Sequence, residues 1–271
     1  VAILEVKNLN LGFTCECGFM QALVDVSFSL EKGKMHALVG ESGCGKSISA
    51  MSILKLLPKT AQITSGEIFF NGQNLITLSN KQMQGIRGSK IALIPQDPMT
   101  SLNPLDTVGN QLLEVIKIHQ GLRGKEAYDV AVEALESVQI PCASHRMKSY
   151  PHEFSGGMKQ RAIIAMALAC KAEIIIAVEP TTALDVTNQA QIMNLLNEIK
   201  TETGTSILLI THDLALVGEN ADEVSVMYAG RIVETSLAGE FFVNPKHPYS
   251  IALLKSLPSN NLETLETING Q

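Results

Sequence analysis

The sequence predicts an α/β fold in which a largely parallel β-sheet carries a helical insertion. An apolar segment, 35–39, is joined to a helical segment, 48–57, by a glycine-rich run. Strand-like and helical segments alternate again beyond residue 170, as in parallel sheets whose strands are joined by crossover helices. The stretch between these regions has the apolar spacing of helices. We therefore expect one large domain, 1–258, followed by a polar tail, 259–271.

The front of the chain is expected to be rich in β-strands. Apolar and polar residues alternate along 22–30, and short apolar runs occupy 3–9 and 67–70. Asn71 and Gly72 follow the last run, and this pair is typical of a tight hairpin turn because both residues tolerate positive φ. These strands form a β-rich front subdomain that flanks the glycine-rich run.

The middle of the chain, about 97–160, is predicted to be an inserted helical subdomain. Segments 108–119 and 125–138 carry apolar residues at spacings of three and four, which gives each helix one apolar face. The α/β pattern then resumes in four segments, which are 174–178, 192–199, 206–210 and 224–233. Ala229 and Gly230 are expected to form a hairpin turn within the last of them.

Composition argues against several classes of function. Hydrophobic residues make up 45% of the chain, but no apolar run reaches the roughly 18 residues of a membrane-spanning helix. The first residues lack the basic flank and long apolar core of a secretion signal. The net charge of −6 argues against a nucleic-acid-binding surface. We expect a soluble chain that binds no nucleic acid.

The five cysteines are odd in number and scattered, which suits a reducing compartment better than a disulfide framework. Cys15 and Cys17 flank a glutamate and would suit a soft metal. No second pair of Cys or His residues lies near them in the sequence, however. An ordinary loop is the preferred interpretation of this segment.

The glycine-rich run has the spacing of a phosphate-binding loop. Its residues are Gly40, Glu41, Ser42, Gly43, Cys44, Gly45, Lys46 and Ser47. The glycines let successive backbone N–H groups turn toward phosphate oxygens, and the following helix adds the positive end of its dipole. Lys46 would reach the β- and γ-phosphates, and the Ser47 hydroxyl would ligate magnesium. The run therefore predicts binding of ATP with Mg²⁺.

A second glycine motif, Ser155-Gly156-Gly157, opens a helical segment. The Ser155 hydroxyl and the free N–H groups at the helix start form an anion-binding site, but the nucleotide bound by the same chain does not need this site. The motif therefore predicts a partner that brings a phosphate. Two further polar residues follow apolar strand segments: Glu179, whose carboxylate would polarise a water, and His212, which would donate to the γ-phosphate.

These motifs resemble those of the ATP-binding subunit of an ABC transporter, over nearly the whole chain. The residues that match the family's remaining motifs, in its order, are Gln96 (Q-loop), Ser155 to Gly157 (signature), Glu179 (catalytic carboxylate), Asp185 (D-loop, 182–185) and His212 (switch histidine). The resemblance implies the ABC ATPase form of the P-loop NTPase fold. It also implies ATP hydrolysis, with Gln96 sensing magnesium and the attacking water.

The resemblance implies partners as well. Two such ATPases meet head to tail, and ATP lies between the phosphate loop of one chain and the signature of the other. The second ATPase is either identical or different, and the pair serves two transmembrane permease subunits and, indirectly, an external substrate-binding protein. Residues 97–104 are expected near the permease. The chain would then be peripheral, at the cytoplasmic face of the cell membrane.

One position departs from the family's pattern. The strand before Glu179 should end in an aspartate that holds magnesium, but this sequence has Val178. Magnesium requires oxygen ligands, so the change should weaken metal placement more than nucleotide binding. Two interpretations follow: an active ATPase, or a nucleotide-binding subunit whose own site turns over poorly while the partner's site hydrolyses ATP. Asn188 also looks unusual, but it has no chemical interpretation at this stage.

The aromatic residue that stacks on adenine is expected upstream of the phosphate loop, where Phe13 and Phe19 are available. Phe13 is preferred because it follows the first predicted strand, whereas Phe19 lies just before the second. Either residue would also serve as an ordinary core aromatic.

The subgroup within the family is indicated by further segments. The ATPases of the dipeptide, oligopeptide and nickel importers have segments similar to 96–104, 151–158 and 245–249, with Leu253, Leu254 and Pro258. Peptide and nickel both stay open as substrates. Many members carry a C-terminal cysteine cluster for an iron–sulfur centre, but this chain has no cysteine after Cys170, and truncation before such a cluster stays open. A DNA-repair or translation ATPase is disfavoured, because the chain has no long coiled-coil insertion or second ATPase domain.

Overall fold

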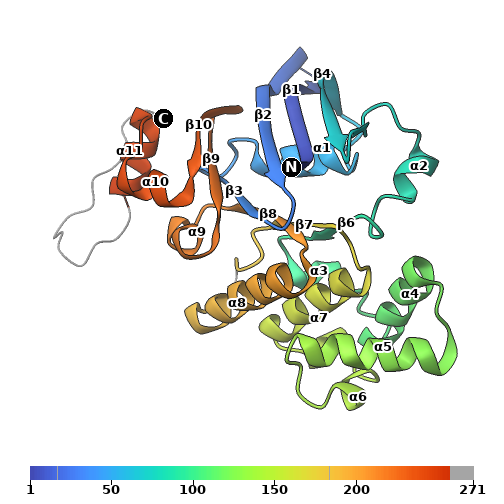
Figure 1. Cartoon of the computed structure of the whole chain (residues 1–271). Helices are drawn as coiled ribbons and strands as arrows, with labels where there is room; N and C mark the ends of the chain where they lie inside the picture. Colours follow the sequence, from blue (N-terminus) through green and yellow to red (C-terminus); the bar gives the residue numbers. More distant parts are fainter. Residues whose placement is uncertain (17, 183, 257–271) are drawn as a thin grey trace. The chain divides into compact units, whose positions relative to one another are not determined.

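The computed structural model describes residues 1–16, 18–182 and 184–256. The chain divides into two compact units, one formed by residues 1–79 with those from 206 onward, the other by residues 80–205. Figure 1 shows the helices and strands of both. The predicted polar tail, 259–271, lies outside the described residues, as do Pro258, Cys17 and Ala183.

An antiparallel sheet makes up much of the first unit. It consists of β1 (Ala2–Cys15), β2 (Gly18–Glu31), β4 (Ala61–Phe70) and β5 (Gln73–Asn74), in the order β2-β1-β4-β5. β1 and β2 are both longer than predicted, because they pair with each other as far as Cys15 and Gly18. The predicted hairpin turn is confirmed, since Asn71 and Gly72 have φ values of 48° and 79°.

The other strands of the first unit are mainly parallel. β3 (Met35–Val39) pairs in parallel with both β8 (Ser206–Thr211) and β9 (Glu223–Tyr228). β10 (Arg231–Leu237) is antiparallel to β9, and the turn between them has φ values of 45° at Ala229 and 77° at Gly230. Every residue of β3 and β8 is buried, as expected for central parallel strands.

The helices described in the first unit are α1 (Lys46–Ile53), α9 (Leu214–Asn220), α10 (Ala238–Val243) and α11 (Pro248–Lys255). The bounds predicted for α1, 48–57, are wrong at both ends. α1 starts directly after Gly45, which is its N-cap, and it ends at Ile53. The chain leaves the helix there because Lys55 adopts a φ of 51°.

The second unit combines a parallel strand pair, β6 (Ile91–Ile94) and β7 (Ile174–Val178), with helices. Those described are α2 (Asn80–Gln84), α3 (Pro98–Ser101), α4 (Val108–Gln120), α5 (Gly124–Ser137), α6 (Ala143–Arg146), α7 (Gly156–Ala169) and α8 (Val186–Thr203), with a 3₁₀ turn at Pro151–Glu153.

The helical predictions of the middle region are confirmed. α4 and α5 match the predicted 108–119 and 125–138, with bounds shifted by one residue, and both pack on α7 (Figure 1). α8 is much longer than the predicted 192–199, because the Asp185 side chain caps it seven residues earlier, before Val186. None of the helices that the structure describes is both long and apolar enough to span a bilayer.

Candidate functional site

The phosphate loop connects β3 to α1 through backbone that favours glycine. Gly40 and Gly45 have φ values of 149° and 111°. A Cβ at Gly40 would lie 2.2 Å from the Met227 carbonyl oxygen, and one at Gly45 would lie 2.7 Å from Leu23 Cδ2. Gly40 is therefore required by space as well as by conformation, because its neighbour is the backbone of β9. Gly45 is favoured mainly by its conformation, because the nearest atom there belongs to a side chain of β2. The residues between them that are exposed are Ser42 and Gly43.

The charge of the loop suits a bound anion. Lys46 is only 4% exposed, and its ammonium group donates to the carbonyl oxygens of Gly40 and Glu41, both at 2.8 Å. Burial raises the pKa of the Cys44 thiol, so this side chain stays neutral. Ser47 is exposed in the first turn of α1, where the helix dipole is positive. These groups fit a bound triphosphate.

His212 lies at the same sheet edge as the phosphate loop. β3 and β8 are parallel, and Val39 pairs with Thr211. Gly40 and His212 are therefore the first residues beyond the carboxyl ends of two paired strands, which is where ligands of parallel sheets bind. His212 is exposed, and Asp213 after it caps α9 by accepting two backbone N–H groups at 2.9 and 3.3 Å. That cap fixes the turn that carries the histidine.

Gln96 and Glu179 meet at a carboxyl edge of the second unit. β6 and β7 are parallel, with Ile94 paired to Ala177. Gln96 Nε2 donates to Glu179 Oε2 at 2.9 Å, and the Thr182 hydroxyl donates to the same oxygen at 3.0 Å. Glu179 is 7% exposed and has a φ of 44°, a conformation that is uncommon for residues with a side chain. The structure thus joins two predicted catalytic residues and adds Thr182 as a second donor.

Val178 ends β7 inside the core. It is 2% exposed, and its side chain has no oxygen atom to offer a metal. Over the described parts of the chain, no group of three or more His, Cys, Asp or Glu side chains is arranged to hold a metal ion. Ser47 and Gln96 supply oxygen atoms of the kind that magnesium binds. The site residues therefore fit a triphosphate, but the carboxylate expected for magnesium at this strand end is missing.

The signature motif opens α7. Ser155 is the N-cap, and its Oγ accepts from the Met158 N–H at 3.3 Å. Ser155 is exposed, and a Cβ added at Gly156 would meet no atom within 4 Å. The N-terminus of this 14-residue helix is therefore accessible, as the predicted anion site requires.

Asn188 connects the D-loop aspartate to the signature. Asp185 caps α8, and its carboxylate oxygens accept from the Asn188 backbone N–H at 2.9 Å and from the side-chain amide at 2.6 Å. These hydrogen bonds hold the pKa of Asp185 below its ordinary value. A Cβ on Gly157 would lie only 3.2 Å from Asn188 Oδ1. The sequence marked Asn188 as unusual, and the structure shows which groups it contacts.

Phe13, the aromatic residue expected to stack on adenine, has a different position in the first strand from the predicted one. Phe13 does not follow the first strand but lies within β1, half-buried, opposite Met20 of β2 and Ala61 of β4. Phe19 is 51% exposed, and its ring covers Gly12, where an added Cβ would lie 2.3 Å from it. Neighbouring residues of a strand point to opposite faces, so Phe13 and Gly12 are on different sides of β1. Stacking of adenine on Phe13 stays a prediction.

A support of the phosphate loop was missed in the sequence. Segment 245–249 carried only a subgroup resemblance, yet the Tyr249 hydroxyl accepts a hydrogen bond from the Glu41 N–H at 3.4 Å. The turn after β9 supports the loop as well, because the Gly230 N–H donates to the Cys44 carbonyl at 3.0 Å. The separation of these residues in the chain left no local signal.

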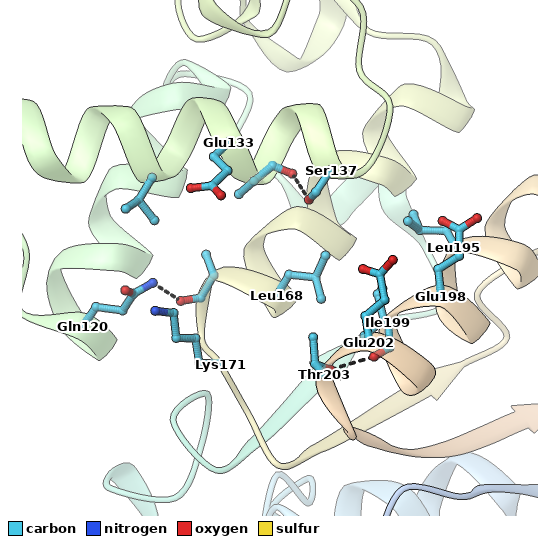
Figure 2. Close-up of a pocket in the computed structure, with 13 residues that line it drawn as sticks. Gln120, Glu133, Ser137, Leu168, Lys171, Leu195, Glu198, Ile199, Glu202 and Thr203 are labelled. Atoms are coloured by element: carbon cyan, nitrogen blue, oxygen red, sulfur yellow. Dashed lines mark hydrogen bonds between the residues drawn. The ribbon is translucent and has the colours of Figure 1, made fainter.

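A cavity of about 350 Å³ lies within the second unit (Figure 2). Leu168, Leu195 and Ile199 contribute apolar surface to it. Its charged lining residues are Glu133, Lys171, Glu198 and Glu202. No residue of the glycine motifs, and none of the predicted catalytic residues, lines this cavity, so it is separate from the candidate nucleotide site.

A buried strand, a glycine loop with a buried lysine and an open helix start define a P-loop nucleotide-binding protein. The family model described as "ABC transporter" matches residues 23–182. This chain belongs to the ABC transporter family and is an ABC-type ATPase.

Curated relatives are similar over most of their length. The probable peptide ABC transporter ATP-binding protein y4tR of Sinorhizobium fredii is 51% identical, covering 94% of this chain and 77% of the relative. The dipeptide transport ATP-binding protein DppD of Bacillus subtilis is 50% identical, over 97% and 79% respectively. The oligopeptide transport ATP-binding protein OppD of the same organism is also 50% identical, over 99% and 76%.

Solved structures agree with this assignment. The ATP-binding cassette MJ0796, in a dimeric post-hydrolysis state bound to ADP and Pi, has a TM-score of 0.78 at 26% identity and covers 87% of this chain and 98% of its own. CbiO1 from Clostridium perfringens, part of the ABC transporter complex cbiONQ, has a TM-score of 0.77 at 28% identity, covering 93% of each chain. The predicted ABC ATPase fold is confirmed.

Proposed function

We propose that this chain is the ATP-binding and ATP-hydrolysing motor subunit of a peptide importer. The observation that carries the proposal is a phosphate loop that fits a triphosphate, in a chain about half identical to ATP-binding subunits of peptide transport. Peptides are favoured over nickel because the relatives described above are named for peptides, dipeptides or oligopeptides.

The proposed assembly is a head-to-tail pair of ATPases on two permease subunits, peripheral at the cytoplasmic face of the membrane, served by an external substrate-binding protein. The exposed Ser155 and the open N-terminus of α7 support this arrangement, since they offer an anion site to a second chain. The dimeric state of the similar cassette MJ0796 supports it as well. The second ATPase is either another copy of this chain or a different one.

The proposed chemistry divides between the two strand edges. Lys46 and the N–H groups at the start of α1 hold the triphosphate and neutralise its charge. His212 donates a hydrogen bond to the γ-phosphate. Glu179 accepts a proton from the water that attacks the γ-phosphorus, while the bond from that phosphorus to the bridging oxygen breaks and ADP leaves. Gln96 orients both the carboxylate and that water. Ser47 and Gln96 would each offer magnesium an oxygen ligand, and the metal would supply positive charge that offsets the charge of the phosphates.

Transport by the reconstituted assembly tests this function. The chain, its permease subunits and its second ATPase are placed in vesicles, and ATP-dependent uptake of a labelled oligopeptide and of nickel is measured side by side. We expect peptide uptake without nickel uptake, and loss of uptake with Lys46→Ala. Nickel uptake alone would overturn the substrate class, and failure of the purified chain to bind ATP would overturn the motor function.

A second candidate function rests on Val178. A buried apolar side chain, 2% exposed, stands where a carboxylate should place magnesium, so the chain's own site would bind ATP and dimerise but turn over slowly. Turnover would then come from the partner's site. Separate measurements of ATP binding and of single-turnover hydrolysis at this site distinguish the two functions, because only the motor function requires hydrolysis here.

The contact with the permease is proposed at residues 97–104. Hydrogen bonds connect residues within the segment: Asp97 caps α3 by accepting from the Met99 N–H at 2.8 Å, and Ser101 Oγ donates to the Asp97 carbonyl. A cavity of about 260 Å³ beside it is lined mainly by apolar groups, including Leu102 and Ile163. A cytoplasmic segment of the permease with an apolar side chain suits this cavity.

Bulky substitutions test this contact. Ser101→Trp and Asn103→Trp should leave ATP binding by the isolated chain unchanged while uncoupling hydrolysis from peptide uptake or releasing the permease during purification. Tyr150→Trp, at another exposed position of the second unit, is the matched control. Normal transport and normal co-purification in both test variants would place the membrane contact elsewhere.

A further inference from the structure

One buried carboxylate anchors the segment between α10 and α11. Glu234 lies in β10 and is 8% exposed. Its Oε1 accepts from the Lys246 N–H at 2.9 Å, and its Oε2 accepts from the His247 N–H at 2.8 Å. Burial raises the pKa of Glu234, but the hydrogen bonds it accepts outweigh burial, so the pKa lies below its ordinary value. The group is therefore charged at neutral pH, and charged acceptors make strong hydrogen bonds.

Tyr249 extends this anchor to the phosphate loop. The His247 side chain caps α11, because its Nδ1 accepts from the Tyr249 N–H at 3.1 Å. The Tyr249 ring is 8% exposed and packs against Tyr228, with 4.4 Å between the ring centroids. Its hydroxyl accepts from the Glu41 N–H at 3.4 Å. Burial raises the pKa of Tyr249 to about 12, so the hydroxyl keeps its proton.

The phosphate loop is consequently hydrogen-bonded at two points to residues from the C-terminal part of the first unit. Tyr249 holds the N–H of Glu41, near the start of the loop, and the Gly230 N–H holds the Cys44 carbonyl near its end, at 3.0 Å. The two supports are themselves connected, since Tyr228 packs on Tyr249 and lies two residues before Gly230. The loop amides of residues 42 and 43 therefore lie between two hydrogen-bonded points.

We propose that Tyr249 is a positioning residue for the phosphate loop, through which segment 245–249 sets the affinity for nucleotide. A loop that is ordered in advance loses less conformational entropy when it binds a triphosphate. The proposal rests on nucleotide binding by the loop and not on the identity of the transported substrate. A neutral hydrogen bond of ordinary strength corresponds to about a three- to tenfold change in Kd.

The test variant is Tyr249→Phe, which keeps the ring on Tyr228 and removes only the hydroxyl. Titration of the isolated chain with a fluorescent ATP analogue should show a three- to tenfold higher Kd. In the assembled transporter KM for ATP should rise by the same factor, with kcat at saturating ATP within about twofold of the parent. Hydrogen exchange without nucleotide should be faster at the Glu41 amide.

The matched control is Tyr128→Phe. The Tyr128 hydroxyl also makes a single hydrogen bond to backbone, at 3.3 Å to the Ser144 carbonyl, but in the second unit. We expect no change in Kd for this variant. An unchanged Kd for Tyr249→Phe, or an equal rise in both variants, would overturn the positioning role. If the parent chain fails to bind the analogue, the failure lies with nucleotide binding itself, and Lys46→Ala then behaves like the parent.

Discussion

The two carboxyl edges that carry predicted site residues differ in how many of the expected side chains they contain. The edge of β3 and β8 carries the loop glycines, Lys46 and His212. At the edge of β6 and β7, Gln96 and Glu179 are hydrogen-bonded at 2.9 Å, but Val178 replaces the carboxylate. We therefore expect nucleotide binding and metal placement to be separable, because a backbone loop would provide the first and one side chain the second.

The largest expected effect separates binding from chemistry. Lys46→Ala removes the buried cation of the loop, and nucleotide affinity should fall by about a hundredfold or more, because charge-assisted contacts to phosphate are lost. Glu179→Gln keeps shape and hydrogen bonding, so its Kd should stay within about threefold of the parent. Equilibrium binding of a labelled nucleotide measures both. Similar losses of affinity in the two variants would contradict the assignment of nucleotide binding to the β3 and β8 edge and of chemistry to the β6 and β7 edge.

The next effect concerns the altered edge. Val178→Asp should restore the magnesium anchor and raise magnesium-dependent turnover of the assembled transporter by about tenfold or more, while Kd for ATP changes less than about threefold. Val178→Asn is the matched control, since it adds oxygen without charge and should gain less. Equal turnover in the parent and the aspartate variant would show that magnesium is placed by other groups.

A third effect should appear in the partner. Ser155→Arg fills the open N-terminus of α7, so ATP sandwiching on the second chain's phosphate loop should weaken by about tenfold, because the helix N-terminus no longer reaches the phosphate. Binding to this chain's own loop should be unaffected. Nucleotide crosslinking scored separately for each chain measures the difference. Loss of labelling on this chain alone would rule out the head-to-tail arrangement.

The smallest effect concerns the contact between Gly157 and Asn188. Gly157→Ala improves helix propensity but brings a Cβ to 3.2 Å from Asn188 Oδ1. The stabilisation should therefore be larger in an Asn188→Ala background, with a coupling of about 0.5 kcal/mol in the free energy of unfolding. Denaturant unfolding of the parent, the two single variants and the double variant measures this coupling. Additive values would mean that the two residues do not interact.

Features that depend on neighbouring residues could be predicted closely. α4 and α5 were predicted with bounds shifted by one residue, because their apolar spacing reports one helix face. The hairpin turns at 71–72 and 229–230 were predicted from the glycine that each contains, because glycine tolerates positive φ. The bounds of β1, β2 and α1 were less accurate, because strand pairing and the positive φ of Lys55 set them.

The sequence by itself determined the family and the phosphate loop, since a strand, glycines, a lysine and a helix start follow one another directly. Only the tertiary structure decided which distant residues meet there. Gln96 reaches Glu179 across 83 positions, and Tyr249 reaches Glu41 across 208. Asn188 lies beside Gly157 from a different helix. Such contacts depend on which strands pair and which helices pack, and no local pattern of side chains encodes that choice.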